Sequence, residues 1–192
     1  MKLLFKGPVI ITGGSSQLGM ALARALREEG AKTLSVCRSS EGLARCGEAG
    51  LSCLPLDEPE SLPERCRGLL GEPPAHLVDL MHSRFESLIA GAAPEAIMEW
   101  AAVDIGLRAG LVRAVGRSML ARRFGRCVFV SSSAAECPAE GQGYYAAAKL
   151  AGEALYRSLA VELSGRGVTA CSLRLSWLDA GRGAVFLERR RE

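Results

Sequence analysis

The sequence predicts an α/β fold, a doubly wound parallel sheet flanked by helices on both faces, formed by a single domain over residues 1–192. Three observations predict it. Short apolar runs alternate with longer helical stretches, a glycine-rich loop follows the first apolar run, and 48% of the residues are apolar, enough for a substantial core. Alternation of strands and helices implies βαβ units, in which neighbouring strands run parallel.

The first two elements are a strand at residues 9–11 and a helix after it. Leu18, Leu22 and Leu26 recur every four residues, which places them on one face of a helix that Gly30 ends. The later elements are short apolar runs and longer amphipathic or alanine-rich stretches. We predict strands at residues 33–36, 51–54, 75–81, 127–130 and 168–175, and helices at residues 39–50, 61–70, 95–123 and 145–164.

Charge and cysteine content exclude several classes of protein. The net charge of +3 is spread along the chain, so we expect no nucleic-acid partner. The seven cysteines form no CxxC pair and are odd in number, which fits neither a disulfide framework nor a metal site. The chain has no apolar run of membrane-spanning length, so we expect no membrane role. These features predict a cytoplasmic protein with reduced thiols.

In a parallel sheet of this kind ligands bind at the carboxyl ends of the strands. The loop TGGSSQLG, residues 12–19, follows the first strand and opens a helix, as a phosphate-binding loop does. Its glycines permit a tight turn, and the start of the helix offers free N–H groups. The alternative is an ordinary turn with a serine cap. The residues that we predict to contact a dinucleotide here are Gly13, Ser15, Ser16, Gln17, Leu18 and Gly19.

The end of the second strand indicates which dinucleotide is bound. NAD-selective sites usually carry an acid here for the ribose hydroxyls, but this chain has Cys37 and Arg38. A guanidinium group pairs well with a 2′-phosphate, so Arg38 favours NADP(H) over NAD(H). The alternative is an exposed surface arginine.

Tyr145 and Lys149 are four residues apart, on one face of a predicted helix. An ammonium group close to a phenol favours the phenolate, so this pair suits proton transfer. Ser132 lies at the carboxyl end of the strand before that helix, placed to hold a carbonyl oxygen for the tyrosine. Tyr144 points about 100° away around the helix and is interpreted as a pocket-wall or packing residue.

Taken together, these segments resemble the short-chain dehydrogenase/reductases of the classical type. The matching motifs are TGGSSQLG at 12–19, LD at 56–57, VFVSSS at 128–133 and YAAAK at 145–149, which occur in the order and at the spacing of that family. The resemblance covers nearly the whole chain and implies a Rossmann-like fold. Among subgroups the chain is most similar to the 3-oxoacyl-carrier-protein reductases.

The resemblance implies a role for each matching residue. Ser132 would orient the substrate carbonyl, Tyr145 would donate a proton, and Lys149 would bind the nicotinamide ribose and tune Tyr145. Asp57 would contact the adenine. The implied activity is NADPH-dependent reduction of the ketone of a 3-oxoacyl thioester or a related small molecule.

The chain departs from the family pattern in several places. Gln17 replaces a glycine, and residues 79–83 read DLMHS where the family has Asn-Asn-Ala-Gly. His82 in that stretch is interpreted as structural rather than as a catalytic base. Gly106 falls where the family has an asparagine that bends the helix and holds a water in the proton relay.

The C-terminal part is expected to be short or missing, with residues 183–191 as the opening of a substrate helix or residues 184–187 as an edge strand. These departures motivate an alternative function, a non-catalytic or weakly active relative that acts as a partner or structural subunit.

The resemblance also implies assembly. Relatives pair through their two long helices, here residues 95–123 and 145–164, so we expect a homodimer and an option to form a tetramer. The second helix is rich in alanine and glycine over residues 146–154, which permits close helix packing. The alternative is that these small residues pack on the sheet.

Overall fold

The computed structural model describes residues 5–178 and Glu188. Within this part of the chain six strands form one parallel sheet in the order β3-β2-β1-β4-β5-β6. The strands are β1 (Val9–Thr12), β2 (Thr33–Cys37), β3 (Cys53–Pro55), β4 (His76–Asp79), β5 (Gly125–Ser132) and β6 (Val168–Leu175). The predicted α/β class is confirmed.

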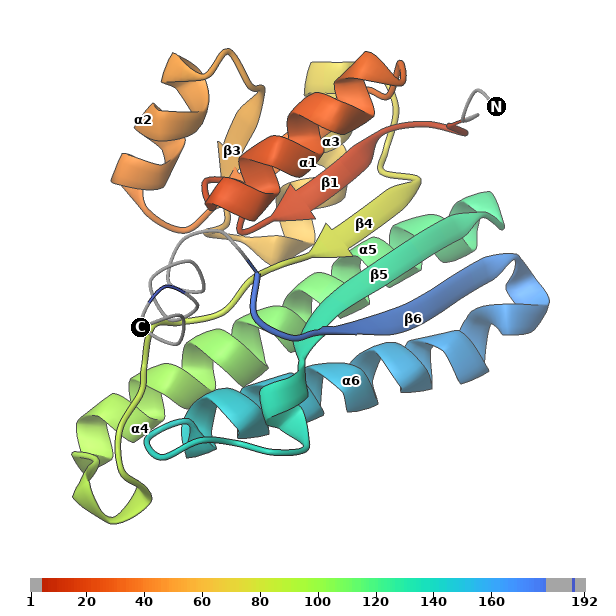
Figure 1. Ribbon diagram of the computed structural model, residues 1–192. Helices are drawn as coiled ribbons and strands as arrows, with labels where there is room; N and C mark the ends of the chain where they lie inside the picture. The colour runs from red at the N-terminus through yellow and green to blue at the C-terminus, as the bar shows by residue number, and fades with distance from the viewer. Residues whose placement is uncertain (1–4, 179–187, 189–192) are drawn as a thin grey trace.

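Helices connect the strands and cover both faces of the sheet (Figure 1). The α-helices are α1 (Gln17–Glu28), α2 (Ser40–Glu48), α3 (Leu62–Leu70), α4 (Pro94–Trp100), α5 (Arg108–Arg122) and α6 (Gly143–Leu163). The helix predicted at residues 95–123 is wrong in one respect: a π-helical segment, η3 (Ala101–Leu107), lies between α4 and α5. Among the described residues no helix is long and apolar enough to cross a bilayer.

The strand order reverses beside β1, which pairs with both β2 and β4. Thr12 and Asp79, the last residues of β1 and β4, lie opposite each other in the sheet. The loops that leave these two strands therefore diverge from one point, and this is where open α/β sheets bind their ligands.

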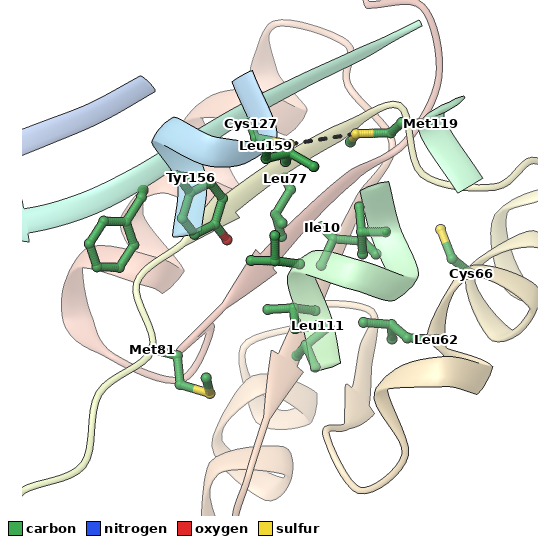
Figure 2. Close-up of a cluster of buried hydrophobic side chains, with 14 of the residues drawn as sticks. Ile10, Leu62, Cys66, Leu77, Met81, Leu111, Met119, Cys127, Tyr156 and Leu159 are labelled. Carbon is green, nitrogen blue, oxygen red and sulfur yellow. Dashed lines mark hydrogen bonds between the residues drawn. The ribbon is translucent and has the colours of Figure 1, made fainter. Parts of the chain in front are cut away.

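Two hydrophobic cores cover the two faces of the sheet. Successive strand residues point to opposite faces, so Val9 and Ile11 enter the core beneath α1 and α2, whereas Ile10 between them enters the other core. The second core fills the space between the sheet and α3, α5 and α6. Figure 2 shows part of it, where Ile10 and Leu77 of the sheet point toward Leu111 of α5.

The small residues of α6 are divided between its two sides. Ala148 and Gly152 are buried, and a Cβ atom added to Gly152 would collide with the ring of Phe129 on β5. Ala147 and Ala154 are exposed. Packing on the sheet therefore explains part of the small-residue pattern, and the homodimer stays a prediction. The alternatives considered for residues 183–191 and 184–187 lie outside the described residues.

We predict that Gly152→Ala destabilises the protein by about 1–3 kcal/mol, because the new methyl group must displace the Phe129 ring in a packed core. Gly68→Ala on α3 is the matched control, since its new methyl group would meet no atom within 4 Å. That control should be neutral or stabilising by up to about 1 kcal/mol. Urea unfolding measures both; equal midpoints for the two variants would contradict the prediction.

Candidate active site

A cavity of about 700 Å³ opens at the carboxyl ends of β1, β2 and β4. Residues from the phosphate loop, the end of β2 and the loop after β4 line it. They include Gly13, Ser15, Ser16, Arg38, Met81 and His82. The structure thus brings the predicted phosphate loop and the predicted cofactor-selecting arginine to one cleft.

The phosphate loop has the close backbone packing that its glycines permit. Gly13 has φ +64°, and a Cβ atom there would lie 3.0 Å from the Leu80 carbonyl oxygen. A Cβ atom on Gly19 would lie 2.6 Å from the Gly13 carbonyl oxygen. The Ser16 side chain caps α1 by accepting a hydrogen bond from the Gly19 N–H at 3.0 Å. The start of α1 therefore faces the cleft.

Gln17 and Leu18 do not share this placement. Gln17 is exposed, and Leu18 packs against the core beneath α1. Neither belongs to the described residues that line the cavity. A Gln17 side chain directed to solvent leaves the cleft unobstructed, although their predicted contacts with a dinucleotide stay predictions.

Two arginines stand at the β2 side of the cleft. Arg38 is exposed, lines the cavity and donates from Nη2 to the His82 carbonyl oxygen at 3.1 Å. Arg45 of α2 also lines the cavity and donates from Nη1 to the Ser15 carbonyl oxygen at 3.3 Å. Sequence reasoning missed Arg45, whose signal was its place one helical turn after Glu41, with which it forms an ion pair.

Lys149 is the most unusual ionisable group of the predicted catalytic set. Its side chain is buried, and Nζ donates to the Val130 carbonyl oxygen at 2.8 Å. Nζ also lies 5.5 Å from the centre of the Tyr145 ring. Burial lowers the pKa of the Lys149 ammonium group to about 8, and the nearby Arg108 guanidinium adds to this, whereas Asp79 and Asp104 oppose it.

Two consecutive serines end β5 and have different environments. Ser131 is buried, and its hydroxyl donates to Glu153 Oε1 of α6 at 2.6 Å. Ser132 is partly exposed and accepts a hydrogen bond from the Ala134 N–H at 3.2 Å. Lys149 is held by the same strand two residues earlier, at Val130. Ser132 thus ends the strand whose backbone holds Lys149, and its contact with a substrate carbonyl stays a prediction.

The two adjacent tyrosines also differ. Tyr145 lies edge-on to His82, with ring centres 5.7 Å apart. Tyr144 is buried against Phe85 and Trp100, with ring centres 5.0 and 5.2 Å away, and its hydroxyl donates to the Ile89 carbonyl at 3.3 Å. Tyr144 is thus a packing residue, as its place on the helix predicts.

Comparison with known proteins agrees with this geometry. The family model for short chain dehydrogenase matches residues 94–182. A short chain dehydrogenase of Pseudocercospora fijiensis is 31% identical, across 91% of this chain and 60% of that protein. The 3-oxoacyl-(acyl-carrier-protein) reductase of Escherichia coli is 29% identical, across 86% of this chain and 71% of the relative. The chain is thus similar in sequence to short chain dehydrogenases and 3-oxoacyl-(acyl-carrier-protein) reductases over 86% to 91% of its length.

Solved structures show the same fold. A 3-oxoacyl-(acyl-carrier-protein) reductase from Agrobacterium tumefaciens, with NADP bound, has a TM-score of 0.81 at 23% identity and covers 98% of this chain and 76% of its own. A xylitol dehydrogenase with NAD+ bound has a TM-score of 0.79 at 18% identity, and the match covers 96% of this chain and 74% of the xylitol dehydrogenase chain. The chain spans 60% to 71% of the length of the two curated relatives above.

The loop after β4 reads DLMHS at residues 79–83, where the family pattern has Asn-Asn-Ala-Gly. Leu80 packs into the core beneath α1, and Met81 packs into the opposite core. Both side chains are buried, so their bulk lies within the protein. The larger residues at these positions are therefore compatible with a ligand in the cleft.

Asp57 takes part in a local ion pair. Its carboxylate lies 2.6 Å from Nη1 of Arg65 and accepts the Glu58 N–H at 2.9 Å. The hydrogen bond from Arg65 lowers the pKa of this exposed carboxyl group. Leu56 lines the cavity, whereas Asp57 is not among the described residues that do. Its contact with adenine stays a prediction.

The helix around Gly106 has no asparagine side chain at that position to hold a water. In the structure Asp104 of η3 is buried, and both of its carboxylate oxygens accept from the Ser83 N–H, at 2.8 and 3.1 Å. The neighbouring Arg108 is fully buried as well. A charged pair four residues apart within an apolar helix was the signal in the sequence.

The lowered pKa of Lys149 predicts a pH-dependent stability. Below pH of about 8 the folded protein carries a buried ammonium group, at a cost on the order of 3 kcal/mol. As the pH rises from about 8 toward the ordinary lysine value of 10.5, the folded state releases its proton before the unfolded state does, and the cost declines.

We therefore expect Lys149→Met to be more stable than the wild type at pH 7, by about 1–3 kcal/mol, with the difference shrinking by pH 10. Urea unfolding at the two pH values tests this. Lys32→Met, at an exposed lysine, is the control and should show no such dependence. A Lys149→Met protein that is less stable by the same amount at both pH values would disprove the prediction.

Proposed function

We propose that this chain forms an NADP(H)-dependent reductase of a carbonyl compound, with Tyr145 as the proton donor. The substrate class that we favour is the ketone of a 3-oxoacyl thioester or a related small molecule, because several of the most similar curated relatives are named as such reductases. The observation that carries the proposal is the buried Lys149 beside Tyr145, whose ring lies edge-on to His82. Lys149 and Tyr145 are not among the described residues that line the cleft, but His82 lines it together with the phosphate loop.

The residues of the cleft fit a dinucleotide phosphate. The backbone around Gly13 is too close to Leu80 to admit a side chain, and the capped start of α1 supplies N–H groups for a pyrophosphate. Arg38 and Arg45 would hold a 2′-phosphate. NADP(H), when bound, supplies hydride chemistry at the carbonyl carbon.

The side chains of the chain itself would manage the carbonyl oxygen and its proton. Ser132 would donate a hydrogen bond to that oxygen, and Tyr145 would protonate it as negative charge develops. The Lys149 ammonium would stabilise the resulting phenolate and, held by the Val130 carbonyl, keep one position through the reaction. A lysine pKa of about 8 suits proton exchange near neutral pH.

Tyr145→Phe is expected to lower the turnover number at least 1000-fold, because a phenyl ring has no proton to donate, while NADPH affinity changes less than threefold. Steady-state oxidation of NADPH with a 3-oxoacyl thioester measures the first quantity, and fluorescence titration measures the second. Tyr144→Phe is the control: it loses only the hydrogen bond to Ile89 and should keep most of the activity. Equal activity of the two variants would sink the proposal.

Cofactor selectivity is tested by Arg38→Ala and Arg45→Ala. Each should weaken NADPH binding by about 10- to 100-fold and leave NADH binding nearly unchanged, since only NADPH offers a 2′-phosphate. Arg27→Ala, at an exposed arginine that donates to the Gly50 carbonyl at 2.8 Å, is the control. If neither nucleotide binds the wild type, the non-catalytic alternative takes the place of this proposal.

The homodimer is a further part of the proposed function. Leu150 is 47% exposed and lies on the same exposed face of α6 as Ala147 and Ala154. We propose that a second copy covers this surface, and sedimentation equilibrium of the protein at micromolar concentration measures the association.

A further inference from the structure

Three charged side chains are buried beside the cleft. Asp79, Asp104 and Arg108 are 0%, 1% and 0% exposed, and together they are named the Arg108 cluster. A buried charge is strongly destabilising unless it is paired and hydrogen-bonded, so the contacts of these groups fix where each element can lie.

The guanidinium group of Arg108 connects three segments of the chain. Its Nε donates to Asp79 Oδ2 at 3.2 Å, at the end of β4. The two terminal nitrogens donate to the carbonyl oxygens of Met81, in the loop after β4, and of Asp104, in η3. One planar group thus holds a strand end, a loop and a helix in a fixed relation.

Asp104 lies in the π-helical segment η3, and Arg108 follows that segment directly. The backbone N–H of Arg108 donates to the Ile105 carbonyl, and the Asp104 carbonyl accepts from the Arg108 side chain. Local π-helical turns often occur at functional sites, and the side chains of Asp104 and Arg108 are both buried here.

The carboxylates of Asp79 and Asp104 both accept hydrogen bonds from backbone N–H groups of the loop after β4. Asp79 accepts from the Met81 N–H at 2.9 Å, and Asp104 accepts from the Ser83 N–H at 2.8 Å. Residues 80–83 contribute to the wall of the cleft. The loop is therefore bound at Met81 through both its N–H and its carbonyl group, and at Ser83 through its N–H.

The cluster also adjoins the lysine of the proposed catalytic set. Arg108 and Lys149 each lie 5.2 Å from the centre of the Phe129 ring. A displacement of Arg108 would therefore disturb the packing beneath Lys149 as well as the wall of the cleft.

We propose that Arg108 is a positioning residue: with Asp79 and Asp104 it fixes residues 80–83 as a wall of the cofactor cleft. The acid–arginine–acid set takes over from two features that this chain lacks, the Asn-Asn-Ala-Gly loop and the helix asparagine. The two departures from the family pattern are then one coupled change. The part of the inference that concerns the cofactor rests on the proposed function.

The test is amide hydrogen exchange by NMR on the whole chain without nucleotide, with Arg108→Lys. Lysine keeps the charge but has no planar fork to reach three acceptors. We expect exchange at Met81 and Ser83 to become at least tenfold faster, while amides in β1 and β2 keep their rates. NADPH affinity should fall about tenfold. Arg113→Lys, at an exposed ion pair on the same helix, should change neither quantity.

A second variant, Asp79→Asn/Asp104→Asn/Arg108→Met, removes all three charges while the amides still accept from the loop N–H groups. It should loosen residues 80–83 in the same way, because the Met81 carbonyl loses its donor, and it replaces Arg108→Lys if that variant does not fold. Unchanged exchange at Met81 and Ser83 in either variant would overturn the inference. A uniform acceleration of all amides, or a loosened loop with unchanged NADPH affinity, would overturn it too.

The exchange measurement separates this inference from the proposed function. A wild type that binds no NADPH, with a loop that still loosens on Arg108→Lys, would remove the proposed function and leave the positioning of the loop by Arg108 standing.

Discussion

The buried carboxylate of Asp79 is the constraint on which the arrangement of this protein depends. Asp79 is the last residue of β4 and lies opposite Thr12 of β1, whose hydroxyl donates to Asp79 Oδ1 at 2.6 Å. Arg108 and the Tyr156 hydroxyl, at 3.2 and 3.1 Å, reach it from α5 and α6. Because an unpaired buried charge would cost several kcal/mol, each of these elements has one position that satisfies it. Strand order, helix placement and the cleft wall are therefore coupled at a single side chain.

Burial of the Lys149 ammonium group has two effects: it lowers the stability of the folded protein, and it lowers the pKa of the group. Lys149 would be more stable in water, yet its pKa is brought within reach of neutral pH only because it is buried. Its charge is tolerated because Asp79 and Asp104 partly offset the repulsion from Arg108. The hydrophobic cores on both faces of the sheet stabilise the fold and offset the cost of burying this charge. In the proposed mechanism, the burial that prepares Lys149 for proton transfer also lowers the stability of the fold.

Features that depend on neighbouring residues could be predicted from the sequence, and features that depend on distant partners could not. The apolar strand at Val9–Thr12, the glycine loop after it and the helical spacing of Tyr145 and Lys149 are local patterns. The π-helical segment is not, because it forms where Asp104 and Arg108 find partners on another strand and its loop. Sequence reasoning therefore located the departure from the family pattern at Gly106 and missed the buried Asp104 two residues earlier.

The two halves of the site rest on different physical bases. Cores on both faces hold the phosphate loop, because β1 and β2 are buried throughout. Near Ser132, by contrast, the neighbouring strand β6 is largely exposed, with Leu173 51% exposed. The hydrophobic effect is not directional, so it cannot by itself orient a hydroxyl group.

Hydrogen bonds are directional, and several meet at Glu153 of α6. Its carboxylate accepts from the Ser131 hydroxyl at 2.6 Å and from Nε and Nη2 of Arg174 at 2.7 and 2.8 Å. Polar contacts therefore join the end of β5, beside Ser132, to α6 and β6.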